Sequence, residues 1–174
     1  VTEQEDLVVG IASAGQLASG MPGLVGHCVN VLPLRFAVEG RMPFDQLARQ
    51  AAGTLLDATE HQMAYGALLK KLSVPRDPSR LPLVNILFNL DRDAPPPDCF
   101  PDLSIEQSSL PRLYENFELF LNVVASPDGL RVETQYNADL FDDATVRRWL
   151  GLYEALLRAA VAAPAQAVGQ LDFR

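Results

Sequence analysis

The sequence predicts a mixed α/β (α+β) fold in which a single β-sheet is flanked by helices. Apolar runs of strand length are separated by segments whose apolar residues recur every three or four positions. Two of the runs are joined only by Ser-Pro-Asp-Gly, a connection typical of a β-hairpin. The length of 174 residues, with 48% hydrophobic and 21% charged, suits one unit with a core of its own.

The first two expected strands are 7–14 and 27–38, joined by a loop rich in Gly, Pro and Ser. Pro33 falls inside the second strand. Because proline has no N–H to give to a β-ladder, this strand is expected at a sheet edge or at a bulge.

Asn30 on the second strand shares a face with Cys28, Leu32 and Leu34. An amide buried without partners costs about 1–3 kcal/mol, so some group must bond to it. Either it satisfies free backbone groups at a bulge near Pro33, or it faces a polar channel. The residues alone leave both interpretations open.

The next elements are an amphipathic helix from 44 to about 61 and a second helical stretch, 65–72. His61 and Gln62 lie where the first helix ends. The helix dipole favours a histidine at that position without any further role. Tyr65 is expected to pack.

Residues 76–80, "RDPSR", form a turn before the third expected strand. The prolines around it exclude helix or a regular strand, and Asp77 and Ser79 can bond to neighbouring backbone. Arg76 and Arg80 bracket the turn, and either can form a forked pair with a carboxylate elsewhere. These features predict a stiff turn.

The third strand is expected at 83–90, followed by a proline-rich loop at 91–102. Strands 117–125 and 130–137 then form the hairpin. In the second of these, apolar and polar residues alternate, which predicts one packed face and one wet face.

The last helix is expected to begin at Asp142 or Asp143, whose carboxylate can accept from free N–H groups, and to end at Pro164. Its packed stripe contains Val146, Leu150, Tyr153, Leu157 and Val161.

Composition disfavours several classes of protein. The net charge of −8 leaves no clustered positive surface for nucleic acid. The two cysteines and two histidines cannot supply a metal-ligand spacing, so no metal is expected. The cysteines also give no disulfide framework, and neither a secretory signal nor an apolar membrane span is visible. We therefore expect a cytoplasmic protein that does not bind membranes.

The string "GIASAG" (10–15) invites comparison with the turn that exposes a serine nucleophile in hydrolases. That turn requires glycines two positions before and two after the serine, whereas Gly10 lies three before Ser13. His27 is close in sequence but has no evident orienting carboxylate. A hydrolase is accordingly disfavoured.

Several strings, in order, resemble condensation domains of nonribosomal peptide synthetases. "RDPSRLPL" (76–83) resembles the family's motif Arg-Asp-x-Ser-Arg-Asn-Pro-Leu. "VGHCVNVLPLR" (25–35) resembles the family's strand Gly-x-Phe-Val-Asn-Thr-Leu-Pro-Leu-Arg and ends at Arg35. "HQMAYGALL" (61–69) stands in the place of His-Gln-Asp-x-Pro-Phe-Glu. "LVVGIASAGQ" (7–16) and "YNADLFDDATVRRWLGLYEALL" (136–157) resemble its flanking segments.

Departures from these motifs bear on subtype. Cys28 replaces Phe, Val31 replaces Thr, Gln16 replaces Arg, Leu81 replaces Asn, and residues 63–66 differ from the family pattern. The segment from "YGALLKKL" to "RDPSRLPLVNILFNLDR" is more similar to condensation domains of hybrid polyketide–peptide assembly lines than to those of the common subtype. The family's His-His-x-x-x-Asp-Gly string, which carries its chemistry, does not occur in the 174 residues.

The resemblance implies a fold like chloramphenicol acetyltransferase, in which two lobes enclose a tunnel. Residues 1–174 would be the C-terminal lobe, inactive alone, with the catalytic histidine in the N-terminal lobe. The reaction implied is amide formation, by attack of a carrier-bound aminoacyl amine on a carrier-bound acyl or peptidyl thioester. Separated from its mate, such a lobe is also expected to self-associate weakly through exposed apolar surface.

The implied partners are the N-terminal lobe, donor and acceptor peptidyl carrier proteins, and adjacent adenylation or ketosynthase modules. No cofactor would bind directly, since the 4′-phosphopantetheine belongs to the carriers. Ser13, Gly15 and Asn30 would line the substrate tunnel. The structural motif residues would be Arg35, His61, Gln62, Arg76, Asp77, Ser79 and Arg80.

Two other functions compete with this one. The chain could be a non-catalytic lobe retained for docking carrier proteins or neighbouring domains. It could also be part of a stand-alone acyltransferase of the same superfamily that acts on alcohols, which needs the same histidine. A sequence encoded upstream that bears the His-His motif would separate the catalytic lobe from the docking lobe.

Overall fold

The computed structural model describes residues 4–18, 20–21, 23–75, 77–92, 103, 110 and 112–172. Its centre is a five-stranded sheet with the strand order β2-β1-β3-β4-β5. The strands are β1 (Asp6–Ala14), β2 (Val29–Ala37), β3 (Ile86–Arg92), β4 (Leu119–Ser126) and β5 (Gly129–Tyr136). The helical elements are α1 (Gly15–Ala18), α2 (Phe44–Glu60), α3 (Tyr65–Leu72), α4 (Asp143–Ala162) and the 3-10 turn η1 (Val168–Gln170).

The sheet is mixed. β3 lies parallel to both β1 and β4, whereas the two outer pairs, β1 with β2 and β4 with β5, are antiparallel. β2 is an edge strand and pairs with β1 residue for residue from Asp6↔Ala37 to Ala14↔Val29. Of the two positions expected for Pro33, the structure therefore shows the edge and no bulge.

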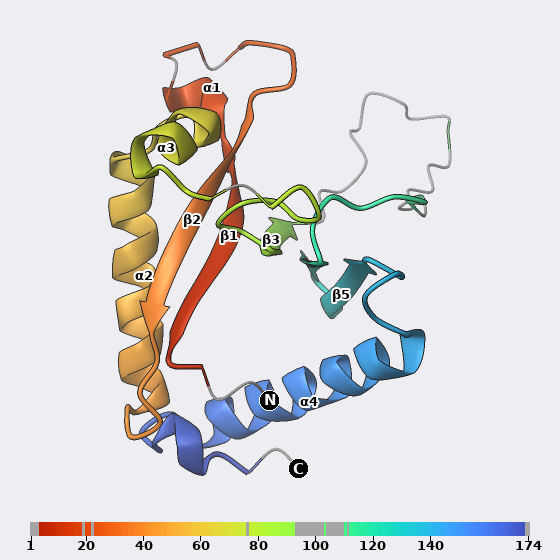
Figure 1. Cartoon of the computed structure of the whole chain (residues 1–174). Helices are drawn as coiled ribbons and strands as arrows, with labels where there is room; N and C mark the ends of the chain where they lie inside the picture. The colour runs from red at the N-terminus through yellow and green to blue at the C-terminus, as the bar shows by residue number, and fades with distance from the viewer. Residues whose placement is uncertain are drawn as a thin grey trace.

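The long helices α2 and α4 lie on the same face of the sheet, towards opposite edges (Figure 1). α2 packs on β2, where Leu32 and Leu34 are buried beneath it. α4 faces β3, β4 and β5 across a cleft of 740 Å³ whose walls include Phe88, Val123 and Leu157. The strand register places Leu32, Leu34, Phe88 and Val123 on one face of the sheet, the face towards the helices.

The opposite face carries a tight contact between β1 and the segment that leads into β3. Val84 is fully buried there, and a Cβ added to Gly10 would lie 2.5 Å from its Cγ1 and 3.1 Å from Leu87 Cδ1. This position therefore needs glycine for close approach rather than for an unusual backbone angle.

The expected strand at 83–90 begins later, at Ile86. Leu83 has a φ of +71°, outside the β region, and the Val84 N–H donates to the Pro82 carbonyl at 2.9 Å. The chain therefore turns once more before it enters the sheet. A four-residue helix, α1, also lies within the loop expected between the first two strands.

The last helix begins as expected. Asp142 is extended, and its carboxylate accepts from the Thr145 N–H at 2.7 Å. This bond holds the pKa of the Asp142 carboxyl below its usual value. The rings of Phe141 and Trp149 pack in a T-shaped arrangement, with their centroids 5.0 Å apart.

The apolar face of the hairpin is less packed than the alternating pattern predicts. Leu130 is 69% exposed and Val132 38% exposed. Val161, expected in the packed stripe of the last helix, lies at the C-terminal end of α4 and is 77% exposed. In the part of the chain that is described, no helix combines the length and the apolar character that crossing a membrane requires.

Candidate functional site

Asn30 lies near the start of β2 and connects it to the beginning of α3. Its amide Nδ2 donates to the Met63 carbonyl at 2.9 Å, and its Oδ1 accepts from the Tyr65 N–H at 3.1 Å. The amide thus satisfies backbone groups, as one sequence interpretation expected, but those of the α2–α3 connection rather than of a bulge. Because α3 has no side-chain cap of its own, Asn30 supplies a partner for its first N–H.

Ser13 stands opposite Asn30 in the β1–β2 ladder, so the two side chains share a face. The Ser13 hydroxyl donates to Gln62 Oε1 at 3.5 Å, a long hydrogen bond. Ser13, Asn30 and Gln62 thus meet where β1 ends, β2 begins and α2 gives way to α3. We call this group, together with Gly15 and Tyr65, the strand-end site.

Gly15 closes the strand-end site on the β1 side. Its N–H donates to the Cys28 carbonyl at 2.7 Å, and a Cβ at this position would collide with the same carbonyl oxygen. Glycine is therefore required for the approach of the two strand ends.

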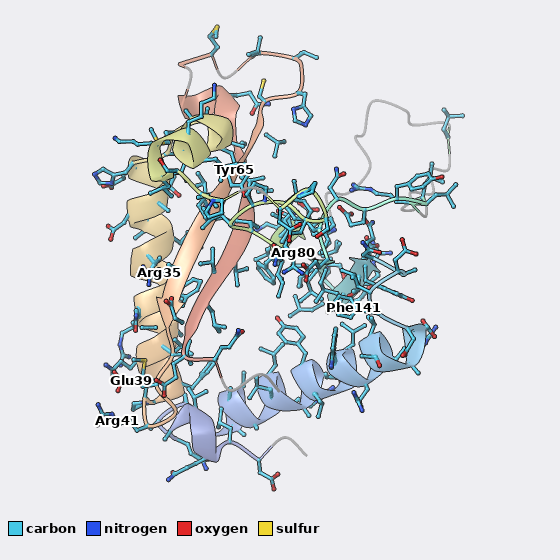
Figure 2. All side chains as sticks on the ribbon, viewed as in Figure 1. Arg35, Glu39, Arg41, Tyr65, Arg80 and Phe141 are labelled. Carbon is cyan, nitrogen blue, oxygen red and sulfur yellow. The ribbon has the colours of Figure 1, made fainter. Side chains whose placement is uncertain are left out.

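Tyr65 joins the strand-end site to the turn that precedes β3. Its hydroxyl donates to the Pro82 carbonyl, and burial raises the pKa of its phenol. Figure 2 shows Tyr65 at the start of α3, above the segment that carries Arg80. The sequence indicated only that Tyr65 packs, because nothing local identifies the carbonyl that it reaches.

The turn at 77–80 is held by its own side chains. Asp77 Oδ1 accepts from the Ser79 N–H at 2.9 Å and from the Ser79 hydroxyl at 2.6 Å. Arg80 Nε lies 3.6 Å from Asp77 Oδ2, and its Nη1 lies 3.5 Å from Glu118 Oε1. Arg80 therefore links the turn to the residue just before β4, while Arg76 lies outside the described residues.

The bonds within this turn make its stability depend on pH. The Ser79 hydroxyl and N–H, with Arg80, hold the pKa of the Asp77 carboxyl below its usual value. A carboxyl with a depressed folded-state pKa stabilises the fold above its unfolded pKa of about 3.9, and this stabilisation is lost as the pH falls through the folded value.

We therefore expect Asp77→Asn to be less stable than the wild type at neutral pH. The difference should shrink as the pH falls below about 4, because the wild-type carboxyl then becomes neutral too. Urea unfolding at several pH values measures it. Ser79→Ala should show the same trend, since it removes the shorter of the two bonds. A difference that grows in acid would contradict the assignment.

Two other residues of the family motifs make their contacts outside the strand-end site. Arg35 binds Asp6 through two hydrogen bonds of 2.8 and 2.7 Å, near the other end of the β1–β2 pair. This contact lowers the pKa of the Asp6 carboxyl and raises that of Arg35. The His61 ring caps α2, with Nδ1 2.9 Å from the Asp57 carbonyl.

The strand-end site can orient groups, but in the described residues it brings no base to Ser13. The partner of the Ser13 hydroxyl is an amide, which cannot accept a proton from a nucleophile. His61 engages the backbone of its own helix. The described residues also contain no group of three or more His, Cys, Asp or Glu placed to hold a metal ion.

Comparison with known proteins places these features in a family. The family model of the condensation domain matches residues 1–173. Surfactin synthase subunit 2 of Bacillus subtilis (strain 168) is 32% identical over 170 residues, or 97% of this chain. Those residues make up only 5% of that subunit, so the chain spans a small part of its relative.

Solved structures share the fold. Holo-AB3403, a four-domain nonribosomal peptide synthetase bound to AMP and glycine, matches with a TM-score of 0.84 at 23% identity, over 99% of this chain and 14% of that one. The X-domain from teicoplanin biosynthesis, solved in complex with OxyB, matches with a TM-score of 0.79 at 19% identity, over 98% and 38%.

Proposed function

The chain belongs to the condensation-domain family, and we propose that it is the C-terminal lobe of a domain that joins two carrier-bound substrates by an amide bond. The match over residues 1–173 carries this proposal, because it includes every motif region of the chain. The absence of the His-His-x-x-x-Asp-Gly string from these residues supports assigning the base to a partner lobe.

In the proposed reaction, the amine nitrogen of an aminoacyl group attacks the carbonyl carbon of an acyl thioester. The C–N bond forms, the C–S bond breaks, and the donor's pantetheine leaves as the thiol. A base must take one proton from the nitrogen, and the leaving sulfur gains one. A neutral amine is already a fair nucleophile, so we assign this lobe the task of positioning, which can supply about 7–11 kcal/mol in favourable cases.

The strand-end site is the part of the lobe best suited to that task. Asn30 is bonded at both ends of its amide, and Gly15 brings the ends of β1 and β2 together. Such a surface is preorganised and needs little rearrangement when a substrate arrives. We propose that Ser13, Gly15 and Asn30 form one wall of the tunnel, while Asp77 and Arg80 hold the fold.

Exposed apolar surface supports the assignment to part of a larger domain. The cleft between α4 and the sheet is lined in part by Leu130, Leu90 and Val132, which are exposed by 69%, 58% and 38%. Contiguous apolar surface of this kind marks a site that another part of a protein covers. We propose that the N-terminal lobe, the carrier proteins and adjacent adenylation or ketosynthase modules are the partners.

Reconstitution tests the proposal. The 174-residue chain is mixed with a separately produced N-terminal lobe bearing the His-His motif, an acyl-loaded donor carrier and an aminoacyl acceptor carrier. We expect amide product, measured by mass spectrometry, only when both lobes are present. Product from this chain without the other lobe would contradict the proposal. The positioning role of this lobe would be contradicted by a different result, in which a change at Asn30 or Gly15 leaves turnover unchanged and loss of the partner lobe's histidine abolishes it.

A second candidate is a docking lobe without catalysis. The likeness to an X-domain that was solved in complex with another protein favours it, although at 19% identity this likeness concerns the fold alone. The docking role predicts carrier or domain binding that is retained in reconstitution without any amide product.

A further inference from the structure

The outer edge of β5 is open in the part of the chain that the structure describes. β5 ends the strand order, and no described strand lies on its outer side. Its pairing with β4 is regular from Ser126↔Gly129 to Leu119↔Tyr136, without a bulge and without proline in β5. The other edge strand, β2, carries Pro33, a residue that discourages strand addition. β5 has no such protection.

The hairpin geometry shows which backbone groups face outwards. Ser126 and Gly129 flank a two-residue turn, so they form a hydrogen-bonded pair of the antiparallel ladder. Hydrogen-bonded and non-hydrogen-bonded pairs alternate along the ladder. The N–H and C=O groups of Leu130, Val132 and Thr134 therefore point away from β4, towards the open edge.

These outward groups restrict how β5 could pair antiparallel with another β5. A two-fold axis must pass beside a residue rather than between two residues, because outward groups must meet outward groups. An axis at Arg131 or at Glu133 would oppose that residue to its own copy, like charge to like charge. An axis at Val132 pairs Leu130 with Thr134 of the second copy and places Arg131 opposite Glu133, twice. An axis at Leu130 would oppose Arg131 to glycine, and one at Thr134 would oppose Glu133 to glutamine. Only the Val132 axis pairs opposite charges across the strands.

The charges are already arranged for such a pairing. Arg131 and Glu133 lie on the same face of β5, with Arg131 Nη2 3.3 Å from Glu133 Oε1. A second copy related by the axis would add a Glu and an Arg opposite them, so that four charges alternate in sign. Opposite charges directly across an antiparallel pair favour it, whereas like charges oppose it.

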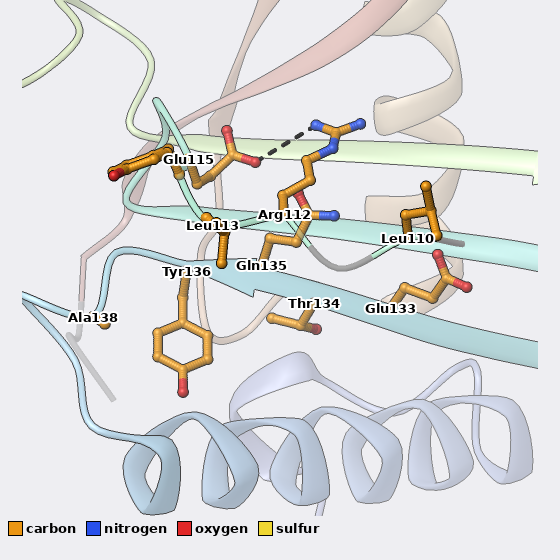
Figure 3. A pocket seen from close by; sticks show the side chains of 10 residues that line it. Leu110, Arg112, Leu113, Glu115, Glu133, Thr134, Gln135, Tyr136 and Ala138 are labelled. Atoms are coloured by element: carbon orange, nitrogen blue, oxygen red, sulfur yellow. Dashed lines mark ion pairs between the residues drawn. The ribbon is translucent and has the colours of Figure 1, made fainter. Parts of the chain in front are cut away.

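Apolar side chains beside the edge would also be covered. Leu130 and Val132 project from β5 to the side of α4 and are 69% and 38% exposed. On the other side, a hollow of 580 Å³ runs along β5 below Leu110 and residues 112–115 (Figure 3). Leu110, Leu113 and Tyr114 at this hollow are 83%, 90% and 91% exposed.

We propose that β5 of one copy pairs antiparallel with β5 of a second copy, about a two-fold axis at Val132, to continue the sheet across a homodimer. Seven residues, 129–135, take part on each side. An interface of this size is small, so the dimer is weak, with a Kd on the order of 100 µM. The inference does not depend on the proposed function.

Charge reversal tests both the surface and the register. Arg131→Glu and Glu133→Arg each place like charges opposite one another, so either variant alone should remain monomeric. Mixed in equal amounts, the two variants again oppose Arg to Glu at both positions and should form a heterodimer about as tight as the wild-type dimer. Sedimentation equilibrium from about 10 to 500 µM, a range that brackets the expected Kd, measures all three.

Two further variants separate this surface from other causes of association. Val132→Pro removes one outward N–H without touching the β4 ladder, and it should abolish dimerisation while circular dichroism remains unchanged. Arg49→Glu on α2, an exposed charge reversal away from the edge, should dimerise as the wild type does. A monomeric wild type at 500 µM, a folded Val132→Pro dimer or a mixture that stays monomeric would each overturn the proposal.

Discussion

Replacing Gly10 with alanine is expected to destabilise the fold by about 3 kcal/mol, at the upper end of the usual range for overpacking a core. The new Cβ would lie 2.5 Å from Val84 Cγ1, a separation that requires atoms to move. Val84 has no exposed surface and Leu87 is 7% exposed, so neither has free space to move into. Urea unfolding measures the loss.

A double-mutant cycle shows whether Val84 is the cause. Val84→Ala by itself should cost about 2 kcal/mol, because it leaves a cavity in a fully buried position. Combined with Gly10→Ala it should cost clearly less than the sum, since the new methyl group occupies the vacated space. Costs that add without coupling would contradict the proposed contact.

Gly53→Ala is the matched control for Gly10→Ala. Gly53 lies within α2, and an added Cβ would meet nothing within 4 Å. Because alanine favours the helix over glycine, this substitution should stabilise the protein by about 1 kcal/mol. The same chemical change is thus expected to have opposite signs at the two sites.

Asn30→Ala is expected to destabilise the protein by about 2 kcal/mol and to loosen the start of α3. The substitution removes the donor to the Met63 carbonyl and the acceptor for the Tyr65 N–H. Each such bond contributes about 1 kcal/mol net, and a partner left buried without one costs more. Hydrogen exchange at the Tyr65 amide should become faster, whereas exchange in the β4–β5 ladder, far from the change, should hardly alter.

Two variants make this prediction specific. Asn30→Asp keeps an oxygen for the Tyr65 N–H but loses the donor to the Met63 carbonyl. This variant should therefore be less stable than the wild type, while its Tyr65 amide stays protected from exchange. Asn116→Ala makes the same side-chain change at an exposed position and should have little effect on stability. Unchanged exchange at Tyr65 in Asn30→Ala would show that the amide does not hold α3.

Local patterns were sufficient for most of the secondary structure. α3 covers the expected residues 65–72, and α4 begins at the expected aspartate cap, because helix periodicity and capping depend on neighbours in sequence. The hairpin followed from two alternating segments around a short turn. The start of β3 was placed too early, since the positive φ of Leu83 has no local signature in a leucine.

Sequence motifs singled out residues of the strand-end site, whose role toward a substrate stays a prediction, but they did not predict the contacts of these residues. The family motifs directed attention to Ser13, Asn30 and Gln62, and the structure brings these three together. The partners of Asn30, however, lie 33 and 35 residues away, and no periodicity indicates which carbonyl or N–H an amide will reach. The ion pair of Arg80 with Glu118 could not be predicted either, because the two residues are far apart in the sequence.

The sequence by itself determined the family, the order of strands and helices, and the absence of the His-His-x-x-x-Asp-Gly string. Only the tertiary structure decided that α2 and α4 share one face, that Gly10 must lie close to Val84, and that no described strand pairs with the outer edge of β5. The physical reason is the range of the interactions. Periodicity and capping act within a few residues. The parallel pairing of β1 with β3 joins residues 77 positions apart, such as Gly10 and Leu87, and at that separation many alternative partners satisfy the same local pattern.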